Sequence, residues 1–140
     1  MITDVKTQIM SANEGIITDE MRTVAEAEGV SPEFVRDGVK DGSIVILKNN
    51  QRKDSIPVGV GAGLSVKINA NIGTSNEKSG LENELKKVKV IEETGPDVLM
   101  DLSTGKGIDE VRKQIIASTK LPIGTVPMYQ AGKEALDEYK

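Results

Sequence analysis

The chain has 140 residues, the size of one domain, and a formal net charge of −4 at pH 7. It has no basic run and an aromatic content of 2%, which argues against nucleic acid as a partner. Cysteine and histidine are both absent, so thiolate and imidazole chemistry are excluded and no metal site is expected within the chain. No apolar run approaches the roughly 20 residues that span a bilayer, and the N-terminus lacks the features of a signal peptide. We therefore expect no membrane partner and a cytoplasmic location.

Residues 1–63 are predicted to form a mainly helical region. Thr18 is a suitable N-cap for a helix that ends at Gly29, and Ser31 caps a second helix that ends before Gly42. The apolar run at residues 44–47 predicts a short strand. Glycines at positions 59, 61 and 63 lead into a strand rather than a helix, so we expect a tight loop there and not a dinucleotide fingerprint.

Residues 64–140 alternate between strand and helix patterns. The predicted strands cover residues 66–72, 97–103 and 121–129, the last ending at Met128-Tyr129. The predicted helices run from a capping box at Ser79 to Gly95, from residue 108 onward, and from Gln130 onward. The charged side chains of the helix between residues 79 and 94 are expected to form a solvated face.

This alternation predicts an α/β fold built from right-handed βαβ units with a parallel sheet. Asn71, Met100 and Tyr129 close consecutive predicted strands at equal intervals of 29 residues (100 − 71 and 129 − 100). Three strands are too few to close a barrel. They form either an open sheet together with the strand near residue 44, or the first three units of a (β/α)8 barrel that is incomplete in this chain.

In both architectures ligands bind at the carboxyl ends of the strands. Asn71 can hold the polar edge of a ligand, with Asn69 on the same strand face, and Asp101 can accept a proton or bind a hydroxyl group. The backbone amides of residues 103–105 can meet a phosphate. Simpler roles stay open, because Asp101 can bond neighbouring amides only and Ser103-Thr104 can cap a helix. Lys106 lies between glycines, but the phosphate-loop motif around it is absent.

Three strings resemble the phosphomethylpyrimidine synthase family of thiamine biosynthesis. They are Val66-Lys-Ile-Asn-Ala-Asn-Ile-Gly-Thr-Ser75, Asp97-Val-Leu-Met-Asp-Leu-Ser-Thr-Gly105 and Pro122-Ile-Gly-Thr-Val-Pro-Met-Tyr-Gln130. The similarity extends into the N-terminal region of residues 1–63. The matching segments there are Gln8-Ile-Met-Ser-Ala12, Gly15-Ile-Ile-Thr18 and Gly29-Val-Ser-Pro-Glu-Phe34. It therefore covers nearly the whole chain.

The resemblance implies a non-classical radical S-adenosylmethionine enzyme with a (β/α)8 barrel. Such an enzyme converts 5-aminoimidazole ribotide to hydroxymethylpyrimidine phosphate, and Asn71, Met100 and Tyr129 match family positions that line the ribotide site. Asn69, Asp101 and Ser103 would support that site, while the resemblance assigns no catalytic residue to this chain. The family is also expected to form homodimers.

The family's C-x2-C-x4-C motif for a 4Fe–4S cluster and its metal-binding histidines, which hold an ion such as zinc, have no counterpart here. An electron from that cluster is needed to cleave S-adenosylmethionine, so we expect a chain that is inactive alone and needs further sequence or a partner chain. A split-enzyme subunit and a stand-alone module for a phosphorylated small molecule are the alternatives. An unpaired strand edge and an uncovered apolar face also predict association, partial order or poor solubility of the chain alone. A discrete monomer in size-exclusion chromatography, with protected amides in all three strands, would contradict this prediction.

Overall fold

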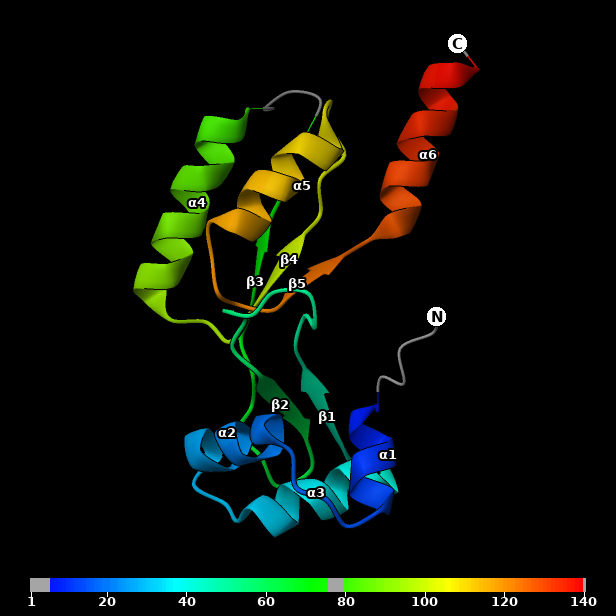
Figure 1. Ribbon diagram of the computed structural model, residues 1–140. Helices are drawn as coiled ribbons and strands as arrows, with labels where there is room; N and C mark the ends of the chain where they lie inside the picture. The colour runs from blue at the N-terminus through cyan, green and yellow to red at the C-terminus, as the bar shows by residue number, and fades with distance from the viewer. Residues whose placement is uncertain (1–5, 76–79, 140) are drawn as a thin grey trace. The chain divides into compact units, whose positions relative to one another are not determined.

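The computed structural model describes residues 6–75 and 80–139 (Figure 1). The chain divides into two compact units, Met1–Val66 and Lys67–Lys140. Within the described residues, no helix is both long and apolar enough to cross a bilayer. Each unit has its own apolar core.

The first unit contains helices α1 (Gln8–Asn13), α2 (Asp19–Glu28) and α3 (Pro32–Asp41), followed by strands β1 (Ile44–Leu47) and β2 (Val58–Gly61). The caps predicted for α2 and α3 are confirmed. The Oγ1 of Thr18 accepts a hydrogen bond from the backbone N of Met21 at 3.2 Å, and Ser31 caps α3 in the same way. Helix α1 was not predicted, because its six residues are too few to show helical periodicity.

The glycine-rich segment at residues 56–63 was wrongly predicted as a loop. Part of it is β2, which pairs antiparallel with β1 from Ile44 opposite Gly61 to Leu47 opposite Val58. A Cβ at Gly59 would lie 2.4 Å from Cγ1 of Val24, so glycine here allows the strand to approach α2 closely. Since β1 pairs with β2, the open sheet that joined the strand near residue 44 to the other three is also wrong.

The second unit alternates strictly between strand and helix. Its elements are β3 (Asn69–Ile72), α4 (Leu81–Thr94), β4 (Val98–Asp101), α5 (Ile108–Ala117), β5 (Ile123–Thr125) and α6 (Pro127–Glu138). The strands form one sheet in the order β3-β4-β5, and both pairs are parallel. The mixed α/β class is confirmed, while the described strands leave the sheet open, so the barrel stays a prediction.

The core of this unit lies between the sheet and helices α4 and α5. Ile72 and Leu99 of the strands pack with Val88 of α4 and with Val111 and Ile115 of α5. Helix α6, in contrast, contributes no buried side chain. The opposite face of the sheet therefore receives no side chain from this core cluster.

The ends of the helices in this unit differ in part from the prediction. Gly95 ends α4 in the left-handed conformation, at φ +70°, as expected. Ser79 of the predicted capping box lies outside the described residues, and the N-cap of α4 is Gly80. Ser103-Thr104 does not cap α5, whose N-cap is Gly107. The strand predicted to reach Tyr129 stops at Thr125, because Pro127 begins α6.

Candidate functional site

Asn71 and Met100 are direct neighbours at the carboxyl ends of parallel strands. The strand register pairs Asn71 of β3 with Met100 of β4, and Met100 with Gly124 of β5. Ile72 and Leu99, the adjacent residues on these strands, face the helical core, and side chains alternate along a strand. Asn71, Met100 and Gly124 therefore form a row on the face away from α4 and α5.

The side chains of this row remain accessible to a ligand. Asn71 is exposed and Met100 is half-buried. The Nδ2 of Asn69 donates a hydrogen bond to Oδ1 of Asn71 at 2.8 Å, which joins the two amides predicted to share a strand face. Gly124 leaves room for Met100, because a Cβ at position 124 would lie 3.0 Å from the Met100 Cε.

Tyr129, the third predicted ligand contact, lies in a helix and not at the end of a strand. It lies in the first turn of α6, where its backbone N donates to the carbonyl O of Val126 at 3.0 Å. Its side chain is 47% exposed. No hydrogen bond among the described residues joins Tyr129 to Asn71 or Met100, so the structure groups two of the three predicted ligand contacts by strand pairing and leaves the third separate.

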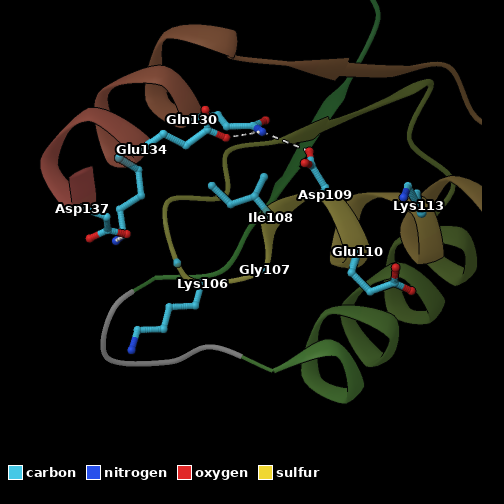
Figure 2. A pocket seen from close by; sticks show the side chains of 11 residues that line it. Lys106, Gly107, Ile108, Asp109, Glu110, Lys113, Gln130, Glu134 and Asp137 are labelled. Atoms are coloured by element: carbon cyan, nitrogen blue, oxygen red, sulfur yellow. Dashed lines mark hydrogen bonds and ion pairs between the residues drawn. The ribbon is translucent and has the colours of Figure 1, made fainter.

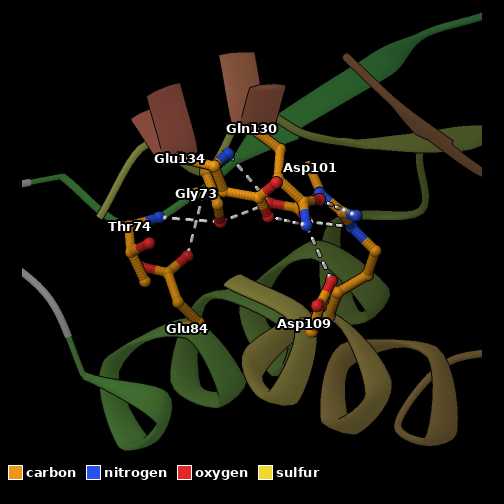
Figure 3. Close-up of polar contacts among 9 residues, drawn as sticks. Gly73, Thr74, Glu84, Asp101, Asp109, Gln130 and Glu134 are labelled. Carbon is orange, nitrogen blue, oxygen red and sulfur yellow. Dashed lines mark hydrogen bonds and ion pairs between the residues drawn. The ribbon is translucent and has the colours of Figure 1, made fainter. Parts of the chain in front are cut away.

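Asp101 and Ser103 are buried parts of a hydrogen-bond network that fixes the strand ends (Figure 3). Asp101, 1% exposed, accepts hydrogen bonds from the backbone N of Ser103 at 3.0 Å and from the Ser103 hydroxyl. The same Ser103 Oγ accepts from the backbone N of Thr74 at 3.1 Å. The loops after β3 and β4 are thereby linked, and both side chains are engaged in hydrogen bonds within the fold.

An arginine extends this network to helix α6. The Nε of Arg112 donates to Oδ2 of Asp101 at 3.1 Å, and its Nη1 donates to Oε1 of Gln130 at 2.8 Å. The Nε2 of Gln130 in turn donates to Asp109 and Glu134. Because Gln130 follows Tyr129, the network holds the beginning of α6 against α5.

Glu84 is a buried structural residue that the sequence analysis missed. It is 1% exposed and its Oε2 accepts from the backbone N of Gly73 at 2.9 Å, just after β3. Lys87 pairs with the same carboxylate at 2.7 Å. The expected solvated face of α4 is therefore wrong at this position. The sequence did indicate this burial, because Glu84 lies three residues after Leu81 and four before Val88, which places it on the apolar face of the helix.

The phosphate site expected at the amides of residues 103–105 is wrong. The backbone N of Ser103 donates to Asp101. The backbone N atoms of Thr104 and Gly105 both donate to the carbonyl O of Thr74, at 2.8 and 3.2 Å. All three amides are thus used inside the fold and cannot receive an anion.

A cleft of about 450 Å³ lies between the N-terminus of α5 and helix α6, beside Lys106 (Figure 2). Its lining holds both charge signs, with Lys106, Lys113 and Lys133 against Asp109, Glu110, Glu134 and Asp137. Lys133 is itself paired with Asp137. The mixed charge gives the cleft no preference for a phosphate group, so Lys106 gains no phosphate-binding role.

The residues present do not fit an iron–sulfur cluster. The sequence has no cysteine and no histidine, and the described residues contain no group of three acidic side chains that would hold a metal ion. The side chains of Asn71 and Met100 can therefore bind and orient a ligand, but they supply no redox chemistry.

Comparison with known proteins gives consistent matches. The model of the radical SAM ThiC family matches residues 7–140. "Phosphomethylpyrimidine synthase" of Dehalococcoides mccartyi strain CBDB1 is 50% identical over 133 residues, which are 95% of this chain and 31% of that protein. The proteins of the same name from Syntrophus aciditrophicus and Desulforamulus reducens are 48% and 52% identical, over 96% and 89% of this chain and 31% and 29% of their own lengths. The chain spans about a third of these curated relatives, and with the family model matched over residues 7–140, it belongs to the radical SAM ThiC family.

Proposed function

We propose that this chain supplies part of the substrate site of a phosphomethylpyrimidine synthase in thiamine biosynthesis. The proposed substrate is 5-aminoimidazole ribotide, and the product of the whole enzyme is 4-amino-5-hydroxymethyl-2-methylpyrimidine phosphate. One observation carries the proposal: Asn71 and Met100 are register partners at the carboxyl ends of adjacent parallel strands, on the face away from the helical core. This is where parallel α/β folds bind their ligands.

Each of the three proposed contacts suits one part of a polar aromatic ligand. Asn71 presents a side-chain amide that both donates and accepts hydrogen bonds. Met100 offers a flexible thioether for packing against a flat ring. Tyr129, from the first turn of α6, adds an aromatic face and a hydroxyl. Asp101 and Ser103 contribute indirectly, by fixing the loops that follow β3 and β4.

The three strand–helix pairs of the second unit are, in this proposal, the first units of a (β/α)8 barrel. The face that carries Asn71 and Met100 would then become the barrel interior, which in such folds is closed by the remaining strands. A chain that spans about a third of its relatives fits this arrangement. In the same way, a homodimer stays a proposal drawn from the family.

The radical step lies outside the chemistry of these residues. S-adenosylmethionine, a 4Fe–4S cluster and a metal ion such as zinc belong to the proposed whole enzyme, and the chain offers no cysteine to bind the cluster. We therefore expect this chain to be inactive alone. The cluster would come from sequence outside these 140 residues or from a partner chain.

The binding part of the proposal is tested by titrating the 140-residue chain with 5-aminoimidazole ribotide and following backbone amides by NMR. We expect saturable shifts at Asn71, Met100 and Tyr129. Asn71→Ala should weaken binding by about tenfold, the worth of one well-placed hydrogen bond. The control Asn83→Ala removes the same group from an exposed position on α4 and should leave affinity unchanged. Equal affinities of the two variants would refute the proposed site.

The catalytic part is tested by the intact mass of the natural polypeptide, isolated with an antibody to the region around Asn71. If the natural protein is about three times longer, as its relatives are, turnover is measured on that protein with the same two substitutions. If its mass matches 140 residues, turnover is measured after adding a cysteine-containing partner. Absence of turnover in the protein or complex so identified would refute the synthase assignment.

A further inference from the structure

Glycine occurs inside two of the described strands, and in β2 each glycine has an evident packing reason. A Cβ at Gly59 would lie 2.4 Å from Cγ1 of Val24. A Cβ at Gly61 would lie 2.1 Å from the carbonyl O of Ser43. The other strand glycine is Gly124 of β5. Because glycine weakens a strand interior, its presence there often marks a bend or a close approach of a ligand or backbone.

The fold itself does not require glycine at position 124. Its φ is not positive, and β5 pairs with β4 in regular parallel register, with Gly124 opposite Met100. Among the described residues, a Cβ at Gly124 would meet one atom within 4 Å, the Cε of Met100 at 3.0 Å. That atom ends a flexible side chain, which can move aside at little cost. The missing side chain therefore matters for the place of the Met100 thioether.

The short separation shows where the Met100 side chain lies. Met100 belongs to β4, yet its terminal methyl group reaches the neighbouring strand at Gly124. Both residues are half-buried, and both belong to the row with Asn71 on the face away from α4 and α5. A side chain at position 124 would displace the thioether from this place.

We propose that Gly124 is a positioning residue, which keeps the Met100 thioether low on the sheet and so makes the site selective for a flat ring. This inference rests on the proposed ribotide site, in which Met100 packs against the imidazole ring. A ring can pack on a thioether that lies along the sheet. A Cβ at position 124 would raise the Met100 methyl group into the space of the ring. A sugar phosphate without a ring places no flat group there and should not be affected.

The test compares two ligands on the 140-residue chain and on its Gly124→Ala variant by NMR titration. Gly124→Ala should weaken the binding of 5-aminoimidazole ribotide about tenfold, because one added methylene in an apolar pocket changes affinity by roughly 10–200-fold. Ribose 5-phosphate carries a sugar phosphate without the ring, and its affinity should stay unchanged. The matched control Gly80→Ala adds the same methyl group at the N-cap of α4, where the nearest atom lies at 3.9 Å. It should change neither affinity.

Two further measurements test the step through Met100. In the ligand-free chain, the Met100 methyl signal should show a nuclear Overhauser contact with Gly124 and should shift in Gly124→Ala. The methyl signal of Met21, which is buried in the first unit, should not move. Met100→Leu removes the Cε atom, so adding Gly124→Ala to that variant should change ribotide affinity by less than about twofold, as for independent sites.

The outcomes separate this inference from the proposed function. A loss of ribotide affinity in Gly124→Ala that spares ribose 5-phosphate and vanishes in the Met100→Leu background supports the positioning role. An equal loss for both ligands, or the same loss in both backgrounds, would overturn it. If the unsubstituted chain binds ribotide through Asn71 and Gly124→Ala keeps the full affinity, the inference alone fails. If the unsubstituted chain binds no ribotide, the proposed site fails and the inference falls with it.

Discussion

The clearest structural prediction concerns Asp101, whose carboxylate connects four segments of the second unit. Asp101→Ala removes the acceptor for the Ser103 backbone N, for the Ser103 hydroxyl and for Nε of Arg112. The first two bonds order the loop after β4, and Ser103 passes this order to the loop after β3. The third bond holds Arg112, which reaches α6 through Gln130.

The expected loss of stability is large for a unit of this size. Removing one partner of a buried ion pair typically costs about 3–5 kcal/mol, because the other charge is left without compensation. Arg112 is 19% exposed and keeps Gln130, so water and the amide relieve part of the cost, and we expect about 3 kcal/mol. Small domains unfold with roughly 5 kcal/mol or a little more. The substitution should therefore remove about half of the stability of the second unit.

Urea unfolding followed by NMR measures this effect one unit at a time. The amides of Leu99 and Ile115 report on the second unit, and those of Val24 and Val35 report on the first as an internal reference. The control is Asp109→Ala, which removes an exposed carboxylate bound to Gln130 and should cost less than about 1 kcal/mol. If both variants shift the Leu99 and Ile115 transitions equally, the reasoning about the buried network is refuted.

Two other predictions concern the backbone at the end of β3 and an ion pair in the first unit. Gly73 has φ +148°, and a Cβ there would lie 2.7 Å from backbone atoms of Leu102 and Ser103, so Gly73→Ala should cost about 2 kcal/mol or more in urea unfolding. Gly132→Ala, in α6 with nothing within 4 Å, should instead stabilise its helix slightly, and a loss at both positions would contradict the steric argument. The hydrogen bond from Lys48 lowers the pKa of Glu20 from 4.5 to about 2, so the pair contributes stability above pH 4.5 that is lost as the pH falls towards 2. The difference in melting temperature between the natural chain and Lys48→Met should shrink over this range, and a constant difference would show that the pair does not act through the Glu20 carboxylate.

Local signals predicted the helices of this protein well. Thr18 and Ser31 cap α2 and α3 as expected, and Gly29 and Gly95 end their helices in the left-handed conformation. These features depend on neighbouring residues along the chain, so they are visible without tertiary structure. The alternation of strand and helix in the second unit was found for the same reason.

Features that depend on distant residues could not be predicted in the same way. Strand β2 pairs with β1, and glycine at position 59 lets its backbone approach α2 closely. From composition alone, a segment so rich in glycine is predicted to be a loop. The burial of Glu84 depends on an amide of Gly73, eleven residues earlier. Asn71 and Met100 were correctly placed at strand ends. The equal spacing to Tyr129 was misleading, because Pro127 ends the strand pattern early and places Tyr129 in a helix.

Helix α6 differs from the other helices of the second unit in how it is held. It buries no side chain, whereas its hydrogen bonds to α5 pass through Gln130. Segments with little apolar burial open locally at low free energy, well before the core around Leu99 and Ile115 unfolds. Among the helices of the second unit, the backbone amides of α6 should therefore exchange their hydrogens fastest. A ligand that contacts Tyr129 would order this helix, so part of its binding energy would be spent on reducing local motion.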